Sequence, residues 1–259
     1  MAPRASTREH WERYWATLPE LDDVYSNEGR IIEQLMRLQP SGRRVLEVGA
    51  GSWRDSIVLD NVGATVVVID YSPASLAVTR RAAQAAGADL LLVRGDGTRL
   101  PFREGAFEIV FHQGLLEHFR DPMPLLLENR RVLAAGGHLL VDVPQAVHPY
   151  TVAKKLMILL GRWFAGWETQ FTVGQLERLL ARSGLRVVAA YGDWMVPGFF
   201  YRSLRYGLRR VGWVLPKYPR GLPPFAQIAA FSRDRFRRTR LAFYTYAMIG
   251  AVGQKPPEG

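Results

Sequence analysis

The stretch that decides the fold is VLEVGAGSWRDSI, residues 45–57. It begins as an apolar segment typical of a buried strand, and Gly49, Ala50 and Gly51 follow directly. Glycines at such a turn let the backbone approach a ligand closely and leave the N-terminus of the next helix open to it. A dinucleotide-binding turn has a further glycine three residues later, whereas this chain has Arg54 there. The stretch predicts a ligand-binding turn and leaves the kind of nucleotide open.

Outward from this turn, apolar strand-like segments alternate with helical patterns. The expected strands are residues 44–49, 64–71, 89–96, 107–114, 136–144, 185–192 and 244–253. Ser72 and Pro73 predict the start of a helix that runs to about residue 86, and Thr172 with Gln175 predicts a capping box on another helix. Strands that alternate with helices are typical of βαβ units and predict an α/β fold with a parallel sheet.

Acidic residues stand at the ends of three of these strands. They are Glu47, Asp70 and Asp96, and the last is followed by Gly97. A carboxylate after the second strand can accept hydrogen bonds from both hydroxyls of a ribose. Asp70 lies close to the spacing of about 20 residues that nucleotide-binding folds show after the glycine turn. The order of these elements predicts a ligand that contains a nucleoside.

Composition limits the classes of protein that fit. Its 259 residues, 48% hydrophobic and 22% charged, are typical of a globular protein with a full core. The absence of cysteine excludes disulfides, thiolate metal sites and a cysteine nucleophile, and no metal site is predicted. No secretory signal or stretch of the roughly 20 apolar residues needed to span a membrane is present. We expect a cytoplasmic protein whose contact with membranes, if any, is peripheral.

Charge is distributed unevenly along the chain. The formal net charge is +10, and residues 197–259 contain 12 Lys or Arg but only 2 Asp or Glu. The first 196 residues have 22 of each sign, so the whole excess lies in the last quarter. Such an asymmetry bears on binding partners rather than on fold.

Taken together, the motifs resemble those of the class I S-adenosylmethionine-dependent methyltransferases over about residues 40–192. The matching segments are VLEVGAGS, VVVIDYSP, VRGDGTRLPF, FEIVFHQGLLEHFRDP and RVLAAGGHLLVDVP. This resemblance implies a Rossmann-like α/β fold with a seven-stranded, mostly parallel sheet, an antiparallel last strand and helices on both faces. It also implies one domain over residues 1–259. Its parts are a cofactor-binding core (40–192), an N-terminal helical cap (1–39), substrate-side inserts (145–171 and 193–240) and the last strand (241–253).

The resemblance implies S-adenosylmethionine as the cofactor and assigns its contacts. The implied contacts are Gly49, Ala50 and Gly51 at the methionine end, Glu47 at the amino group, Asp70 at the ribose, Tyr71 beside the adenine, Asp96 and Gly97 at the adenine edge, and His112, Gln113 and Gly114 at the floor. No third glycine is needed because this cofactor has no pyrophosphate. Many members have glycine where this chain has Trp53, which either points outward or narrows the methionine pocket.

Methyl transfer to a hydroxyl usually needs a base, and histidine is well suited to that role near neutral pH. His112 and His118 are the candidates, although each could instead be a polar residue at the edge of the core. The family's methylators of nucleic-acid amino groups have an Asn/Asp-Pro-Pro-aromatic motif where this chain has HQGL. The sequence therefore favours O- or C-methylation of a small-molecule, lipid-linked or glycan-type acceptor.

Three other functions stay open at this point. The basic C-terminal region suggests an RNA methyltransferase, although nucleic acid is the less favoured partner. An NAD-type oxidoreductase is disfavoured by Arg54 and by the third acidic strand end. A binding module without catalytic activity would keep the same motifs.

Two aromatic or basic segments suggest further roles. Trp11 and Trp15, one helical turn apart, predict a helix that covers the cofactor, and residues 154–171 predict one wall of the substrate pocket. Residues 199–210 predict an amphipathic helix. Its expected apolar side is Tyr201, Leu204, Leu208, Val211 and Leu215, with Arg202, Arg205 and Arg209 on an adjacent side. A second group of arginines lies between residues 233 and 240. We expect this insert either to be a solvated cover or to contact anionic lipid.

Overall fold

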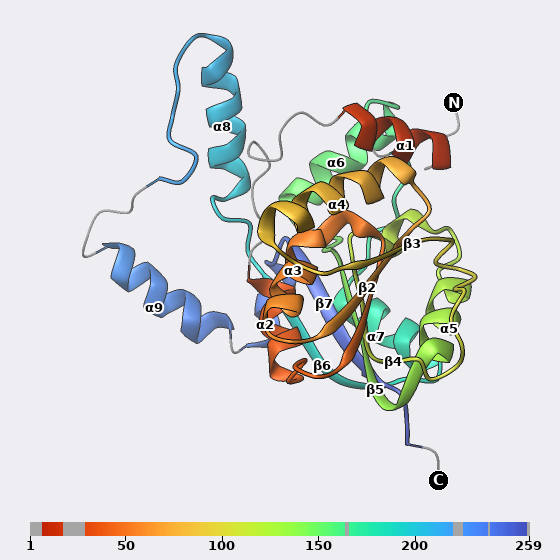
Figure 1. Cartoon of the computed structure of the whole chain (residues 1–259). Coiled ribbons are helices and arrows are strands. Elements are labelled where there is room, and N and C mark those ends of the chain that lie inside the picture. The colour runs from red at the N-terminus through yellow and green to blue at the C-terminus, as the bar shows by residue number, and fades with distance from the viewer. Residues whose placement is uncertain (1–6, 18–28, 164–165, 220–224, 238, 258–259) are drawn as a thin grey trace.

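The computed structural model describes residues 7–17, 29–163, 166–219, 225–237 and 239–257. Its strands are β1 (Arg44–Val48), β2 (Thr65–Asp70), β3 (Leu91–Arg94), β4 (Phe107–Gln113), β5 (Leu133–Pro144), β6 (Arg186–Asp193) and β7 (Met248–Gln254). They form a seven-stranded sheet in the order β3-β2-β1-β4-β5-β7-β6 (Figure 1). Strand β7 is antiparallel to both of its neighbours, and the other pairs are parallel. The expected α/β sheet is confirmed.

Helices cover both faces of this sheet. The α-helices are α1 (Arg8–Thr17), α2 (Arg30–Arg37), α3 (Trp53–Asn61), α4 (Pro73–Ala86), α5 (Met123–Val132), α6 (Pro149–Leu159), α7 (Val173–Arg182), α8 (Phe199–Arg210) and α9 (Phe225–Arg237). Short 3-10 helices are η2 (Ala50–Ser52), η3 (Leu116–His118) and η4 (Arg240–Tyr244). Leucines of α5 and α7 pack in the core on one face. Apolar residues of α2, α3 and α4 pack in the core on the other.

Local sequence signals account for the helix ends that matter for the site. The hydroxyl of Ser72 accepts a hydrogen bond from the backbone N–H of Ser75 at 3.2 Å, as an N-cap does. Gly87 ends the same helix in the left-handed conformation, with φ of 68°. Thr172 and Gln175 form the predicted capping box at the start of α7. Because these caps fix where the helices begin, they also fix the loops that lead from the strands.

Two strands begin three or more residues away from the starts expected from the sequence. The last strand begins at Met248 rather than at residue 241 or 244, because the aromatic run before it forms η4. Ala242 and Tyr246, four residues apart, are both buried, so this run meets the core with helical spacing. Strand β5 begins at Leu133 rather than at residue 136, since a shift in its register with β4 accommodates the extra residues.

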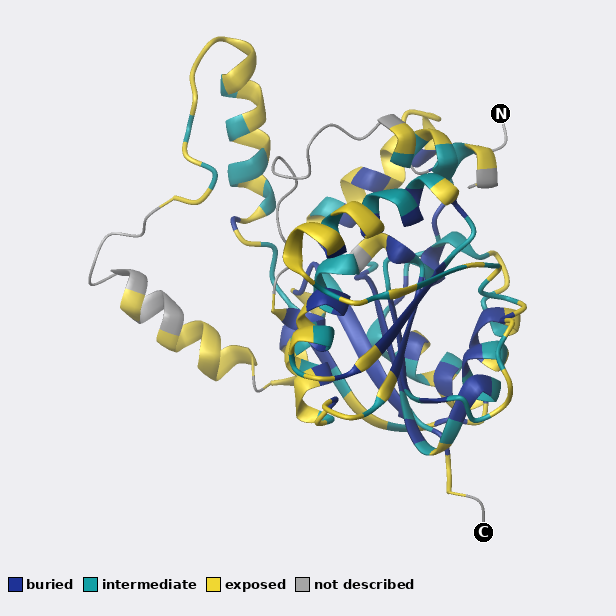
Figure 2. Cartoon of the chain, in the orientation of Figure 1, coloured by how far each residue is buried: buried dark blue, intermediate teal, exposed yellow. Residues whose placement is uncertain are grey.

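The carboxyl ends of β1, β2, β3 and β4 lie together because these strands are parallel neighbours in the sheet. Helix α1 lies over this edge, beside α4 (Figure 1). Helices α8 and α9 extend away from the body of the molecule (Figure 1), and their described surfaces are mostly exposed (Figure 2). The carboxyl edge of the sheet is thus covered by α1, whereas α8 and α9 project away from the sheet.

Candidate functional site

A cavity of about 630 Å³ opens at the carboxyl ends of these four strands. Its walls come from α1, the turn after β1, the ends of β2 and β3, and the segment after β4. The lining residues are Trp11, Trp15, Val48, Gly49, Gly51, Ile69, Asp70, Tyr71, Arg94, Gly95, Asp96, Gly97, Gln113, Gly114, Leu115, His118, Phe119 and Arg120. Its size is in the range of small-molecule and cofactor sites.

The turn after β1 is shaped by Gly49. Its φ of 83° lies in the left-handed region, and its N–H donates to the carbonyl of Ile69 at 2.7 Å, which ties β1 to β2. A β-carbon on Gly51 would lie 3.9 Å from the ring of Trp15, the nearest heavy atom in that direction. The turn therefore presents bare backbone to the cavity. Trp53 does not line the cavity, and the guanidinium of Arg54 stacks on its ring at 5.3 Å.

Asp70 ties the turn to the next helix. Its carboxylate accepts hydrogen bonds from the N–H of Ala50 at 2.9 Å and of Ser72 at 2.8 Å. The hydroxyl of Ser75 donates a third at 3.2 Å. An ionised carboxylate can accept about four, so Asp70, which lines the cavity, has capacity for a further hydrogen bond. Burial raises the pKa of Asp70 above its ordinary value, and these hydrogen bonds oppose that effect.

The wall after β3 is formed by Asp96 and Gly97. One oxygen of Asp96 accepts hydrogen bonds from the N–H and the hydroxyl of Thr98, each at 2.8 Å, which closes a tight turn. A β-carbon on Gly97 would lie 2.9 Å from Val48 and 3.0 Å from Leu125. Only glycine lets this loop lie so close to β1 and α5.

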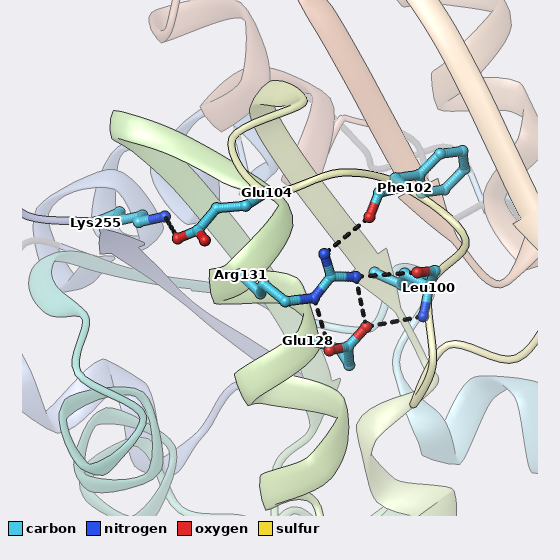
Figure 3. Close-up of polar contacts among 6 residues, drawn as sticks. All are labelled: Leu100, Phe102, Glu104, Glu128, Arg131 and Lys255. Carbon is cyan, nitrogen blue, oxygen red and sulfur yellow. Dashed lines mark hydrogen bonds and ion pairs between the residues drawn. The ribbon is translucent and has the colours of Figure 1, made fainter.

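Arg131 of α5 holds the rest of that loop in place (Figure 3). Its guanidinium donates to the carbonyls of Leu100 at 3.0 Å and Phe102 at 2.8 Å, and it pairs with Glu128 at 2.8 Å. Glu128 in turn accepts the N–H of Leu100 at 2.9 Å. Sequence pattern alone does not predict this network, because two of the partners of Arg131 are loop carbonyls that any residue could supply.

Helix α1 closes the cavity from above. The side chains of Trp11 and Trp15 both line it, as expected for a covering helix. Glu12 fixes the helix, because it accepts hydrogen bonds from the hydroxyl of Ser72 and from the N–H of Ala74 at the start of α4. The ring of Trp11 also meets that of His118, with 4.7 Å between their centroids.

The floor follows β4. Gln113 lines the cavity, and its amide donates to Asp142 at 3.5 Å. Asp142 is fully buried and forms an ion pair with the buried Arg30, with 2.6 Å between the charged atoms. This buried pair, which spans 112 positions of the chain, orients the floor and could not be read from local sequence.

Most of the predicted site residues meet at this cavity. Those that line it are Gly49, Gly51, Asp70, Tyr71, Asp96, Gly97, Gln113 and His118. Ala50 is buried beneath the turn and supplies its N–H to Asp70. Glu47 is fully buried, accepts the hydroxyl hydrogen bond of Ser56, and does not line the cavity.

The two candidate histidines differ in environment. His112 is fully buried outside the lining, and neither ring nitrogen has a hydrogen-bond partner within the described residues. Burial lowers its pKa to about 3. His118 lines the cavity, and burial lowers its pKa to about 4. His118 is therefore neutral at pH 7 and faces the space where a reaction could occur.

Behind His118 lies a buried group of charges from the insert at residues 145–171. Lys154 of α6 and Glu168 form an ion pair with both side chains almost fully buried. The indole N–H of Trp163 donates to Glu168 at 2.5 Å. Glu117 is also buried, and burial, followed by repulsion from Glu168, raises its pKa to about 8. Glu117 is therefore mostly protonated at pH 7.

Within the described ranges, no three or more His, Asp or Glu side chains are grouped as metal ligands. In the same part of the chain, no helix has the length and hydrophobicity needed to cross a bilayer.

Comparison with known proteins agrees with this geometry. Residues 46–141 match the family model of the methyltransferase domain. Over 108 residues the chain is 35% identical to a demethylmenaquinone methyltransferase from Thermus thermophilus, and the match covers 41% of this chain and 49% of that protein. The chain thus spans about half the length of this curated relative.

Longer but weaker similarity extends over most of the chain. An uncharacterized methyltransferase from Mycobacterium sp. (strain KMS) is 27% identical over 210 residues, 79% of this chain and 76% of that protein. A solved S-adenosylmethionine-dependent methyltransferase from Aquifex aeolicus superposes with a TM-score of 0.57 at 13% identity, over 94% of this chain and 98% of that one. This likeness supports the fold.

Proposed function

Because residues 46–141 match the family model of the methyltransferase domain, we propose that this chain belongs to the class I S-adenosylmethionine-dependent methyltransferases and is itself a methyltransferase. The methyl group would go to an oxygen or carbon atom of a small-molecule, lipid-linked or glycan-type acceptor. The observation that carries the proposal is that adjacent strand ends bring Gly49, Asp70 and Gly97 to one cavity. The family model matches only residues 46–141, so we propose both the activity and the acceptor.

The residues of the cavity fit the cofactor. Gly49 and Gly51 offer bare backbone for the methionine part, and Asp70 retains acceptor capacity for ribose hydroxyls. Tyr71, Asp96 and Gly97 also line the cavity, and in this proposal they contact the adenine ring. When bound, S-adenosylmethionine supplies a methyl group on a cationic sulfonium. In this proposal Glu47 does not contact the cofactor but supports the glycine turn through its hydrogen bond with the hydroxyl of Ser56.

The acceptor side of the cavity favours an aromatic molecule. Trp11, Leu115 and Phe119 line the same cavity as Gly114 and His118, so a planar ring would meet apolar and aromatic walls. The named activity of the Thermus relative is methylation of demethylmenaquinone, which is consistent with such walls. Within the proposal, a quinol-type ring is the acceptor we favour.

His118 is the base in this proposal. It is neutral near pH 7, lies in the lining, and contacts Trp11 of the covering helix. A neutral imidazole can take the proton of a phenolic hydroxyl, which raises the electron density of both the oxygen and the neighbouring ring carbon. His112 is the weaker candidate, because its ring is buried away from the cavity.

Ligand titration and methyl transfer test the proposal in sequence. We expect the purified chain to bind S-adenosylhomocysteine and not NADH in calorimetry. With a labelled methyl donor, we expect label in quinone or other lipid extracts rather than in RNA. Binding of NADH alone would overturn the family-based function, and transfer to RNA alone would overturn the acceptor class. Binding of S-adenosylhomocysteine without transfer to any extract would favour a binding module.

The base is tested by His118→Ala. We expect turnover to fall about 100-fold while S-adenosylhomocysteine affinity stays near that of the unaltered protein. His138→Ala is the matched control, because His138 lies within β5, pairs with Ile109 in the sheet and does not line the cavity. An unchanged rate in His118→Ala would mean that the reaction needs no base there.

A further inference from the structure

Helix α6 exposes an apolar stripe. Val152, Leu156, Leu159 and Leu160 recur at the spacing of one helix face and are 55%, 59%, 75% and 57% exposed. The opposite face buries Thr151, Lys154 and Ile158 instead. A helix that turns four aliphatic residues to solvent and a lysine to the interior is the reverse of an ordinary surface helix. Exposed apolar patches of this kind commonly mark an interaction site.

Helix α8 exposes a second stripe. Phe200 and Leu204 of α8 and Val211, which caps its end, have the same helical spacing and are 77%, 55% and 70% exposed. At the tip beyond the helix, Trp213 and Val214 are 69% and 79% exposed. No residue of α8 is buried. The apolar side predicted for this helix is therefore not uniform. Leu204 and Val211 are exposed to solvent, whereas Tyr201 and Leu208 are half-buried.

The tip of α8 is held in this arrangement by its own return segment. The hydroxyl of Tyr201 donates to the carbonyl of Pro216 at 2.8 Å, and Arg205 donates to that of Leu215 at 3.0 Å. Arg202 likewise donates to the carbonyls of Val196 and Pro197. Arg205 therefore holds the segment that follows α8, and Arg202 holds the segment that precedes it. The basic side chains at the tip itself are Arg209, Arg210 and Lys217.

The two stripes belong to the same end of the molecule. Helix α6 follows β5 and α8 follows β6, so both leave the sheet at the carboxyl edge that holds the cavity. The rings of Tyr150 at the start of α6 and Phe199 at the start of α8 are in edge-to-face contact at 6.0 Å. Figure 1 shows both helices on the side of the sheet where α1 lies.

We propose that this surface docks on an anionic lipid bilayer. It comprises Val152, Leu156, Leu159, Leu160, Phe200, Leu204, Val211, Trp213 and Val214, and is called the docking surface below. The aliphatic and aromatic side chains enter the headgroup layer, while Arg210 and its basic neighbours meet lipid phosphates. Docking is independent of the proposed reaction, since it uses none of the residues that line the cavity.

Charge and side-chain type favour this partner over two others. The basic excess of the chain lies in the region that contains α8, so two copies of this surface would repel each other. An RNA partner would satisfy the arginines, but its bases stack on aromatic rings and would leave the leucine and valine stripe of α6 unoccupied. An anionic bilayer satisfies both the charges and the aliphatic residues.

Vesicle co-sedimentation of the full chain tests the proposal. The vesicles are phosphatidylglycerol with phosphatidylcholine in equal amounts, and phosphatidylcholine alone, both at low salt. We expect binding to the anionic vesicles that weakens as salt is added. The variants Leu156→Glu with Leu159→Glu, and Trp213→Glu with Val214→Glu, should each reduce the partition coefficient at least about 10-fold.

A control pair, Val58→Glu with Leu91→Glu, alters apolar residues that are 42% and 51% exposed outside the docking surface. It should bind vesicles as the unaltered protein does, and thermal melts and S-adenosylhomocysteine titration should show all variants folded. Negligible binding of the unaltered protein to anionic vesicles overturns the proposal. An equal loss of vesicle binding in the control pair also overturns it. The same holds if the docking variants still bind vesicles but lose a concentration-dependent dimerisation or an RNA binding that the unaltered protein shows.

Discussion

Asp70 illustrates how one side chain can shape a site and also line it. Its carboxylate accepts hydrogen bonds from Ala50 in the glycine turn and from Ser72 and Ser75 at the start of α4. These bonds hold the turn and the helix in fixed register, and the same group borders the cavity. A ligand hydroxyl would thus meet an acceptor that is already oriented, which lowers the entropy cost of binding.

Replacing Asp70 with alanine should therefore have two effects. We expect S-adenosylhomocysteine affinity to fall by at least about 10-fold, since lost charge-assisted bonds are worth roughly 1.5–3 kcal/mol. The melting temperature should fall modestly, because the backbone N–H groups of Ala50 and Ser72 lose their acceptor. Calorimetry and thermal melts measure the two effects separately. Asp89→Ala, at an exposed loop position, is the control; unchanged affinity in Asp70→Ala would contradict the ribose assignment.

In Glu117, the effect of burial on the pKa outweighs that of any favourable contact. Its pKa is raised from 4.5 to about 8 by burial and by repulsion from Glu168. Between these two values the unfolded chain loses its proton and the folded chain keeps it. The folded state then binds more protons than the unfolded state, so stability falls as pH rises through this window.

We expect Glu117→Gln to remove this part of the pH dependence. Relative to the variant, the unaltered protein should lose up to about 1.4 kcal/mol of unfolding free energy per pH unit between pH 4.5 and 8. Urea denaturation at pH 5 and pH 8, followed by circular dichroism, gives both values. Glu177→Gln, at a half-buried position of α7, controls for loss of a carboxylate. Parallel curves for Glu117→Gln and the unaltered protein would mean that Glu117 is already ionised in the fold.

At the same scale, strand position predicted which residues reach the cavity but not which way every side chain turns. Gly49, Asp70 and Gly97 follow from the rule that parallel strands end at one edge. Glu47 has a similar position, yet it bonds to Ser56 of α3 and stays inside. His112 is likewise fully buried, on a strand that lies between β1 and β5 in the sheet. Such choices are made by packing between elements, which one sequence pattern cannot show.

At the scale of elements, helices with capping signals were predicted best. The helix that Ser72 and Pro73 begin, and the one with the Thr172–Gln175 box, start where their caps place them. The amphipathic helix at 199–210 also has the expected bounds. Helix α6 begins at Pro149, earlier than the wall expected from residue 154, because His148 supplies an N-cap through its ring nitrogen. Histidine is a rare cap, so its presence gave no clear signal.

The loop after β3 provides a test at this scale, since Arg131 holds it from outside the cavity. Arg131→Met should free the carbonyls of Leu100 and Phe102 and loosen the wall at Asp96 and Gly97 (Figure 3). We expect a loss of about 1–2 kcal/mol of stability. S-adenosylhomocysteine affinity should weaken several-fold, measured by calorimetry. Arg103→Met is the control at an exposed site of the same loop. Affinity equal to the control would show that the wall does not depend on this network.

At the scale of the whole molecule, the chain consists of a core with equal numbers of acidic and basic residues and a basic arm that follows it. The first 196 residues have equal numbers of acidic and basic residues, and they contain the cavity. The arm begins after β6. Its far end returns to the core through Arg237, which pairs with Asp193 at 2.9 Å, and through Phe236, which stacks on Trp194. Between these anchors, α8 adds surface without adding to the core.

Replacement of residues 199–219 by a Gly/Ser segment of equal length tests this division. Because no residue of α8 is buried, the melting temperature should stay within about 2 °C of that of the unaltered protein. S-adenosylhomocysteine affinity should also be unchanged, because no residue of this segment lines the cavity. Binding to phosphatidylglycerol vesicles should weaken, since only the α6 stripe remains. A large drop in melting temperature would contradict the separation of the core from the arm. It would show that α8 stabilises the core although none of its residues is buried.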